Sequence, residues 1–418
     1  MIAKSELHTD VLVVGSGPAG FSAAYTAAKN GARTVLVEQC GDVGGISTCG
    51  LMSHWTGTCD SPLYREILRR SAEENEGERK GRITVTIDPE KLKTLYLEML
   101  SEVGVTLLLY TFAYDSITEG DRVLGVSVVN KSGQTDIYAD VVIDASGDGD
   151  VAARAGAEFI KGRESDRKMQ PATIMFKVGG VDCDRAVFPP SFETLVPTDK
   201  GELQALGKKL LPFPAGHVLL YPTMLPGVVT CNMTNCTEID GTEAVDLTKA
   251  TVTCRRQMSE IVKFLREYAP GYENCYVISS ASLVGIRETR HFVGEYVLNE
   301  EDILAARVFD DYVVRGAHFN FDVHNISGAG LDETGCQHNF KQDKGYTIPY
   351  RCLLPKKTEN LLLCGRNISG THMAHSNFRV MPICVGIGEA AGAAAAIAAK
   401  SGRSPREVTA EEIRARIF

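Results

Sequence analysis

Short apolar runs alternate with an alanine-rich stretch at the start of this 418-residue chain. Residues 11–14 read VLVV, an unbroken apolar run that is typical of a strand buried on both faces of a parallel sheet. Residues 18–30 are rich in alanine and are followed by Gly31, a residue that commonly ends a helix. Residues 34–37 form a second apolar, β-branched run. This order predicts a β-α-β unit.

Two further patterns extend this unit. Polar and apolar positions alternate on both sides of a turn at 131–133, which predicts a hairpin that leads into a buried strand at 141–144. Earlier in the chain, residues 89–103 read as a helix with Asp88 as its N-terminal cap.

The pattern changes between residues 163 and 330. A helix predicted over 246–270 ends at Pro270 and Gly271 and has apolar residues at helical spacing. It lies among three strand-like stretches, at 171–182, 216–235 and 275–288. This segment therefore predicts a mixed sheet with a helix.

A late strand at 360–364 precedes a helix built from small residues, whose start is favoured by Pro382. The second half of the chain thus returns to the pattern of its beginning. We expect an α/β protein in which a mixed α+β substrate domain interrupts the first domain. The predicted division is 1–162, 163–330 and 331–418.

Composition narrows the class of partner. The chain has 44 Lys and Arg against 53 Asp and Glu, a net charge of −9, which disfavours binding to a nucleic-acid backbone. The longest apolar stretch, 390–399, is too short to cross a membrane. The first residues show no signal-peptide pattern, so we expect a cytoplasmic protein. The oligomeric state is left open.

The 12 cysteines show no CxxC spacing, and no histidine pair or cysteine pair has the spacing of a zinc site. We therefore expect reduced thiols and predict no metal.

The first chemical motif is Gly15, Gly17 and Gly20 in the pattern G-x-G-x-x-G, between the first strand and its helix. In such a motif the first glycine allows a tight turn, the second lets the backbone approach a pyrophosphate, and the third allows close packing. Glu38 ends the second strand, where an acid bonds ribose hydroxyls and disfavours a 2′-phosphate. The unit predicts a dinucleotide.

A glycine-rich loop, residues 39–57, follows in place of another β-α unit. It offers the amides and hydroxyls of Gly44, Gly45, Ser47 and Thr48 to a longer cofactor, although an ordinary flexible loop is the alternative.

Several segments together resemble the FAD-dependent oxidoreductase family (FAD-oxidored), within the glutathione-reductase and fumarate-reductase-like flavoproteins. They include GGISTCGLMS (44–53), VVIDASGDGDVAARAGA (141–157) and FRVMPICVGIGEAAGAAAAIAA (378–399). The resemblance implies FAD and a Rossmann-like FAD-binding domain with a three-layer ββα arrangement. The residues expected at FAD are Gly15, Gly17, Pro18, Ala19, Gly20, Glu38, Gln39, Gly44, Gly45, Ser47, Thr48, Ala145, Ser146, Gly147, Gly365, Arg366, Pro382 and Gly386.

In flavoproteins of this build, the N-terminus of the late helix faces the reactive flavin ring. His372, His375, Ser376 and Arg379 lie in what we expect to be a loop just before it. A histidine there could move the proton that accompanies hydride, and Arg379 could hold an anion. The alternative is that these residues only pin the loop and FAD.

Arg287, Arg290 and His291 form a second cluster of cations, which we expect to bind substrate above the ring. The alternative is a structural ion-pair cluster with Glu288 and Glu295. For His318, His324 and His338 we expect surface or core positions, and the alternative is that one of them lines the site.

These observations predict a FAD-dependent dehydrogenase or reductase that transfers hydride between flavin N5 and a small polar substrate, anionic or hydroxylated. The sequence shows neither cluster-binding cysteines nor a nicotinamide module, so electrons would pass to a separate, unidentified acceptor. The alternative is a FAD protein with a non-redox role, such as hydration or isomerisation, or a binding role. Covalent FAD at His54 or Cys49 is left open.

Overall fold

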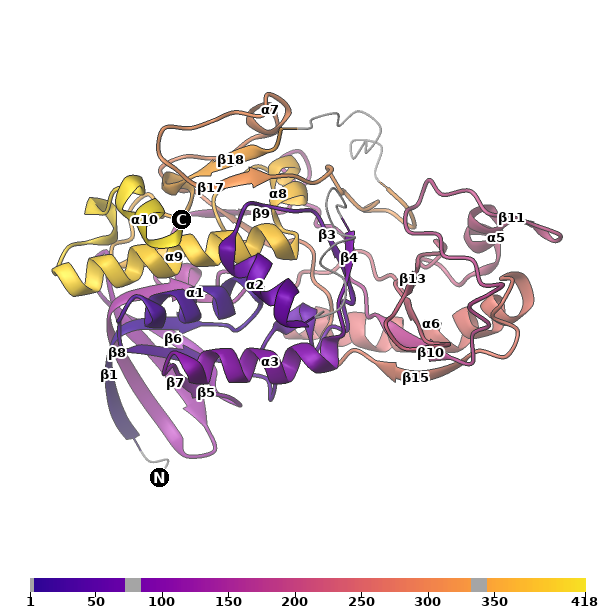
Figure 1. Ribbon diagram of the computed structural model, residues 1–418, viewed down its shortest axis with the longest axis horizontal. Helices are drawn as coiled ribbons and strands as arrows, with labels where there is room; N and C mark the ends of the chain where they lie inside the picture. Colours follow the sequence, from indigo (N-terminus) through magenta and orange to yellow (C-terminus); the bar gives the residue numbers. More distant parts are fainter. Residues whose placement is uncertain (1–3, 72–83, 332–343) are drawn as a thin grey trace.

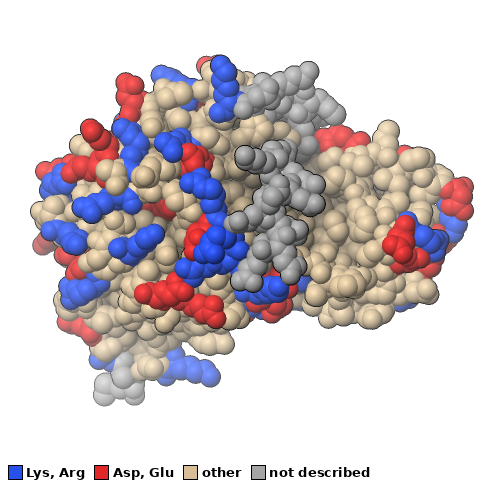
Figure 2. Space-filling model, viewed as in Figure 1, with Lys and Arg blue, Asp and Glu red and all other residues tan. Residues whose placement is uncertain are grey.

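The computed structural model describes residues 4–71, 84–331 and 344–418; His338 lies outside them. Figure 1 shows a larger lobe, which holds both ends of the chain, and a smaller lobe built from its middle. On the face shown in Figure 2, side chains of both charge signs are interspersed over the larger lobe, whereas the smaller lobe displays few charges.

A parallel sheet forms the centre of the larger lobe. Its strands run in the order β5-β2-β1-β8, and β19 pairs with the last residues of β8. Val11 pairs with Thr34 on one side and with Val141 on the other, so the apolar runs lie side by side and are buried. The bounds are β1 (Lys4–Val14), β2 (Thr34–Val37), β5 (Thr106–Leu108), β8 (Gly133–Asp144) and β19 (Leu361–Leu363).

The predicted hairpin joins this sheet. β6 (Phe112–Glu119) and β7 (Arg122–Asn130) are antiparallel, and Asn130 pairs with Gly133 across the expected turn. The first half of β8 therefore pairs with β7, while its last three residues pair with β19. One long strand thus connects the antiparallel and parallel parts.

Two helices from opposite ends of the sequence cover the parallel sheet (Figure 1). They are α1 (Pro18–Lys29) and α9 (Met381–Ser401), and both predicted helix starts are confirmed. A Cβ at Gly388 would lie 2.2 Å from the Ala19 carbonyl oxygen of α1, and a Cβ at Gly392 would lie 2.3 Å from the Ala23 carbonyl oxygen. These glycines therefore pack α9 against α1. α9 is long and apolar enough to cross a membrane, but it is largely buried within the lobe.

The smaller lobe has its own core. β10 (Phe176–Gly179), β13 (Leu220–Pro222), β14 (Val229–Cys231) and β15 (Tyr276–Ser280) form a sheet with α6 (Ala244–Tyr268) beside it. All its pairings are antiparallel, so the mixed sheet expected here is wrong. This second core extends from Ala172 to Ala281, apart from Leu51. Phe292 already packs in the first core, so by packing the inserted region is shorter than 163–330.

One short helix differs from the expected loop. Residues 372–378 form α8 (His372–Phe378), whose N-terminus is capped because the Thr371 hydroxyl accepts a hydrogen bond from the Ala374 amide. The remaining elements are α2 (Pro62–Ser71), α3 (Pro89–Glu102), α4 (Asp150–Arg154), α5 (Leu203–Leu210), α7 (Glu300–Leu304), α10 (Ala410–Ile417), β3 (His54–Thr56), β4 (Thr84–Thr86), β9 (Phe159–Lys161), β11 (Pro197–Thr198), β12 (Gly201–Glu202), β16 (Arg290–Phe292), β17 (Tyr312–Ala317) and β18 (Tyr346–Pro349), with single 3₁₀ turns at Gly45–Ser47, Tyr350–Cys352 and Pro405–Glu407.

Candidate active site

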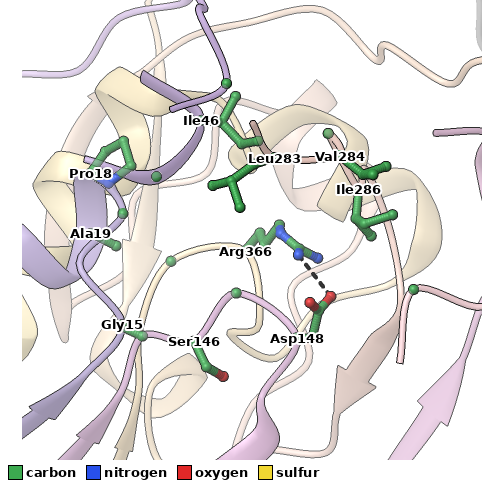
Figure 3. Close-up of a pocket in the computed structure, with 18 of the residues that line it drawn as sticks. Gly15, Pro18, Ala19, Ile46, Ser146, Asp148, Leu283, Val284, Ile286 and Arg366 are labelled. Carbon is green, nitrogen blue, oxygen red and sulfur yellow. Dashed lines mark hydrogen bonds and ion pairs between the residues drawn. The ribbon is translucent and has the colours of Figure 1, made fainter. Parts of the chain in front are cut away.

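A cavity of about 740 Å³ lies between the carboxyl ends of the parallel strands and the smaller lobe. It falls in the size range of ligand pockets, roughly 300–1,000 Å³. Its lining includes the turn after β1, the end of β2, the turns after β8 and β19, residues 282–287, and the segment around the start of α9. Figure 3 shows three of these segments around one space, namely the turn after β1 with Gly15, the turn after β8 with Ser146, and the stretch that contains Leu283 and Ile286.

The three glycines of the first motif have three different environments. Gly15 has φ +92°, and a Cβ there would meet the Ala145 carbonyl oxygen at 2.4 Å. A Cβ at Gly20 would lie 1.8 Å from the Gly15 oxygen, so Gly20 serves helix–strand packing and does not line the cavity. Gly17 borders the cavity and has no protein atom within 4 Å of a Cβ. A bare backbone facing open space at a helix N-terminus fits a pyrophosphate.

Glu38 lies at the end of β2, beside the same space. Its Oε2 accepts hydrogen bonds from the Ser16 amide (2.9 Å) and hydroxyl (2.7 Å), and its Oε1 accepts one from the Cys40 amide (2.8 Å). The carboxylate thus fixes both loops that flank this end of the cavity. Pro18, Ala19, Glu38 and Gln39 all line it.

Only part of the glycine-rich loop reaches the cavity. Gly45 lines it, but Gly44, Ser47 and Thr48 do not. The Ser47 hydroxyl donates to the Gly44 carbonyl (2.6 Å), and the Thr48 hydroxyl donates to the Val43 carbonyl (2.7 Å). The two hydroxyls expected at the cofactor therefore stabilise the fold of their own loop.

The turns after β8 and β19 form the opposite wall. Ala145, Ser146, Gly147, Gly365 and Arg366 line the cavity, and Figure 3 shows the ion pair between Arg366 and Asp148, 2.7 Å long.

The N-terminus of α9 reaches the cavity through Val380, Met381 and Cys384. Pro382 and Gly386 face elsewhere. The Pro382 carbonyl accepts from the Cys59 thiol, and Gly386 packs against Cys59 and Val314. The helix start is therefore placed as expected, but these two residues are not in the lining.

Four ionisable side chains meet at the end of the cavity near α9, namely Arg287, Asp322, His324 and Arg379. Nη2 of Arg379 donates to the Asp322 carbonyl (2.8 Å) and carboxylate (3.1 Å). Nε2 of His324 lies 3.4 Å from the Asp322 carboxylate. Nη1 of Arg287 donates to the Pro171 carbonyl (2.6 Å) and the Thr173 hydroxyl (2.8 Å), so its charge has no carboxylate partner among the described residues.

Burial and mutual charge shift the protonation of this group. Burial acts to raise the pKa of Asp322, but His324 and the two arginines hold that pKa well below its usual value. Burial and the Arg287 charge lower the pKa of His324 to about 4, so the imidazole is neutral at pH 7. Burial also lowers the pKa of Arg287 to about 10, which still leaves it charged.

The histidines predicted to act at the flavin lie behind this wall. Neither His372, His375 nor Ser376 lines the cavity, because their side chains on α8 face the buried Glu288 or their own helix. Of the four predicted catalytic residues, only Arg379 lines it. Burial and the neighbouring His291 hold the pKa of His375 well below its ordinary value.

The three residues of the second predicted cluster do not all lie at the cavity. Arg287 lines the cavity, but Arg290 and His291 do not. Arg290 donates to the Asp148 carbonyl (2.8 Å) and the Asp150 carboxylate (2.9 Å), whereas His291 pairs with Glu288 (2.7 Å). Arg290 and His291 therefore make structural ion pairs, which was the alternative prediction for this cluster. Glu295, which was expected to take part, pairs instead with Arg406.

Asp322, at the polar end, was not predicted, because it carries no motif. For His324 the alternative of a place in the site holds, whereas a surface or core position was the main expectation. Each of the two residues reaches the cavity because the chain returns from the smaller lobe there. His318 does not line the cavity, and neither do His54 and Cys49, the two residues considered for covalent attachment. His54 instead stacks on Tyr221, with ring centroids 3.9 Å apart.

The sequence model of the FAD-dependent oxidoreductase family matches residues 10–417. The chain belongs to this family. FAD is its cofactor, and the open cradle at Gly17, the carboxylate at the end of β2 and the volume of the cavity fit that molecule. The chain spans 40% and 66% of two curated relatives. A digeranylgeranylglycerophospholipid reductase of Picrophilus torridus is 28% identical over 162 residues, 34% of this chain. A thiamine thiazole synthase of Aeropyrum pernix is 34% identical over 183 residues, 41% of this chain.

Solved structures share the fold. A geranylgeranyl bacteriochlorophyll reductase-like protein from Thermoplasma acidophilum matches 99% of this chain and 83% of its own, with 14% identity and a TM-score of 0.50. The anhydrotetracycline hydroxylase OxyS from Streptomyces rimosus matches 98% of this chain and 65% of its own, with 12% identity and the same TM-score. The flavoprotein fold predicted from the sequence is thus confirmed.

Proposed function

We propose that this FAD-dependent oxidoreductase is a dehydrogenase or reductase of a small substrate that carries a carboxylate or a similar anion. The observation that carries this proposal is the unequal charge at the end of the cavity near α9. Arg287 and Arg379 bring two positive charges, and Asp322 brings one negative charge. The neutral His324 adds none.

The described side chains that line this end therefore carry a net charge of one positive unit. The partial positive charge at the N-terminus of α9 has the same sign. An anionic substrate would supply the missing charge and accept hydrogen bonds from the guanidinium groups that line the cavity.

His324 is the residue best placed to move a proton. It lines the cavity beside both arginines, and as a neutral imidazole at pH 7 it can accept a proton from a substrate hydroxyl. Burial and the positive charge of Arg287 hold the pKa of His324 low, and a bound anion would offset that charge and make His324 more basic. Asp322 would stabilise the protonated imidazole from 3.4 Å.

FAD, when bound, supplies hydride exchange at N5. The chain contributes the apolar walls that exclude water, from Met52, Met175, Leu283 and Met381. Oxidation of a hydroxyl group and reduction of an activated C=C bond both need hydride exchange with a neighbouring proton transfer, and the arrangement serves either. The reductase and hydroxylase names of the relatives support redox chemistry but do not define this substrate.

Anaerobic mixing tests the proposal. The purified yellow protein is incubated with a panel of small hydroxy acids, and each acid is paired with its uncharged methyl ester or amide. The dithionite-reduced protein is incubated in parallel with unsaturated acids and their esters. We expect bleaching, or reoxidation, of the visible flavin band with at least one acid and little with its ester. A preference for the uncharged partners would overturn the assignment of an anion site. Turnover without any flavin colour change would instead favour non-redox chemistry.

A further inference from the structure

A second polar cluster lies behind the wall that carries Arg379 and His324. It consists of Glu288, His291, His372 and His375, each at least nine-tenths buried and none lining the cavity. Oε1 of Glu288 accepts hydrogen bonds from Nε2 of His291 (2.7 Å) and Nδ1 of His372 (2.5 Å). Such a concentration of imidazole groups around one buried carboxylate is not needed for the chemistry proposed above.

The cluster leaves ligand atoms unused. Nδ1 of His291, Nε2 of His372 and Nδ1 of His375 are buried without a hydrogen-bond partner among the described residues. Buried polar atoms are nearly always satisfied, so the unpaired nitrogens of His291 and His375 call for a missing partner. A neutral imidazole nitrogen is also a good ligand for a divalent transition metal.

We propose that Glu288, His291 and His375 bind one divalent transition-metal ion of the zinc type. A carboxylate oxygen of Glu288 and one ring nitrogen from each histidine lie within 4.8 Å of one another. One carboxylate with two imidazoles is a ligand set that zinc and ferrous iron use in proteins. The ion would also balance the buried Glu288 carboxylate.

The remaining histidine has a supporting position. His372 holds the Glu288 carboxylate from the side of α8, as the outer partners of metal ligands commonly do. A tetrahedral ion about 2.1 Å from each ligand would separate the ligand atoms by about 3.4 Å. Closing the site around an ion thus needs the ligand atoms to approach one another by up to about 1.4 Å.

The site is connected to the wall of the cavity. The Gln170 amide donates to Oε2 of Glu288 (3.0 Å), and the Gln170 side-chain oxygen accepts from the His324 amide (3.0 Å). On the other side, the Arg379 amide donates to the His375 carbonyl (3.2 Å). An ion would therefore fix the backbones of both His324 and Arg379.

Metal titration of the flavin-loaded protein tests the site without reference to activity. The wild type and the variants His291→Ala, His375→Ala and Glu288→Gln are stripped with a chelator, dialysed and titrated with Zn²⁺ by calorimetry. We expect one tight equivalent in the wild type and at least tenfold weaker binding in each variant. His8→Ala removes an exposed histidine on β1 and should bind like the wild type.

Flavin absorbance and circular dichroism report whether each variant is folded, and His375→Gln replaces any alanine variant that fails this check. Wild-type protein that takes up less than a tenth of an equivalent of Zn²⁺, Fe²⁺, Mn²⁺ and Co²⁺ would overturn the proposal. Equal Zn²⁺ affinity in the wild type and all cluster variants would do the same, because the ion would then bind elsewhere.

Discussion

The hydroxyl of Ser22 donates a 2.7 Å hydrogen bond to the carbonyl of Val385, 363 positions later in the sequence. This bond joins α1 to α9, the two helices that bring their N-termini to the cavity. Around it the helices approach so closely that glycine is required at Gly388 and Gly392. The two ends of the chain therefore form a single layer behind the cofactor site.

We expect Gly392→Ala to destabilise the fold. Its Cβ would lie 2.3 Å from the Ala23 carbonyl oxygen, so the helices must separate. Overpacking of this kind typically costs about 1–3 kcal/mol of unfolding free energy. Thermal unfolding of the FAD-free protein would show a lowered midpoint; an unchanged midpoint would mean that the helices are not so closely packed.

Gly17→Ala should weaken FAD binding and leave the stability of the fold unchanged, the opposite of Gly392→Ala. Gly17 has φ −56°, which alanine adopts freely, and its Cβ would meet no protein atom within 4 Å. The methyl group would instead occupy space meant for the pyrophosphate. We expect at least about tenfold weaker FAD retention, roughly 1.4 kcal/mol, with unchanged stability of the FAD-free protein. Gly179→Ala in β10, whose Cβ would be in ordinary contact with Tyr276, is the matched control and should keep FAD.

The contrast between these glycines shows what the sequence could predict. Motif spacing predicted the roles of Gly15, Gly17 and Gly20 because the turn and the helix start that they form are local in the sequence, although Gly15 also packs against the distant Ala145 carbonyl. Apolar periodicity likewise predicted α1, β2 and the hairpin nearly to the residue. The lining of the catalytic end was harder to predict, because it depends on how α8 and the returning chain are oriented in space.

Arg379→Ala should weaken substrate binding while FAD remains bound. Loss of a charged hydrogen bond to an anion typically costs about 1.5–3 kcal/mol, or about 10–150-fold in KM. Arg379→Lys keeps the charge and should lose less. Arg33→Ala removes an exposed arginine that pairs with Asp10 and serves as the control for loss of a surface charge. Steady-state kinetics with the acid found in the anaerobic screen would measure these effects, and equal KM values for all four proteins would contradict the anion site.

His324→Gln should lower kcat more than it raises KM. Loss of a proton-transfer group typically reduces the rate by about 10²–10⁴-fold. The rate of the wild-type protein should fall as the pH falls toward the His324 pKa, because a protonated imidazole cannot accept a proton. The variant should lack this acidic limb of the pH–rate profile. The pH dependence of single-turnover flavin reduction would measure both effects. A variant that keeps the acidic limb would exclude His324 as the proton acceptor.

Glu389→Gln should change the pH dependence of stability. Burial raises the pKa of Glu389 to about 7, although it accepts from the Leu63 amide (3.0 Å) and the Ser61 hydroxyl. Between pH 4.5 and 7 the native state therefore binds a proton that the unfolded state does not, so this group lowers stability as the pH rises. The variant should be more stable than the wild type at pH 8, by up to about 3 kcal/mol, and closer to it at pH 5. Denaturant unfolding at both pH values would show this, and a pH-independent difference would contradict it.

The misplaced histidines illustrate the limit of sequence reasoning. His372, His375 and Arg379 fall within eight positions, and the sequence alone gave no means to separate them. Residues 372–378 are helical, so successive side chains point in different directions. The helix sends His375 toward Glu288, whereas Arg379, just beyond its end, faces the cavity. Asp322 joins Arg379 across 57 positions, a contact that no local motif encodes.

The pairing of β19 with the end of β8 has a consequence for biosynthesis. While the ribosome is still translating the middle of the message, residues 142–144 present a strand edge that β19 has not yet paired. The surface of α1 against which Gly388 and Gly392 pack is also uncovered at that stage. Exposed edges of this kind promote aggregation of nascent chains. The larger lobe can mature only once codons beyond 400 have been read, so the emerging polypeptide should depend on chaperones, and premature stop codons upstream should yield insoluble product.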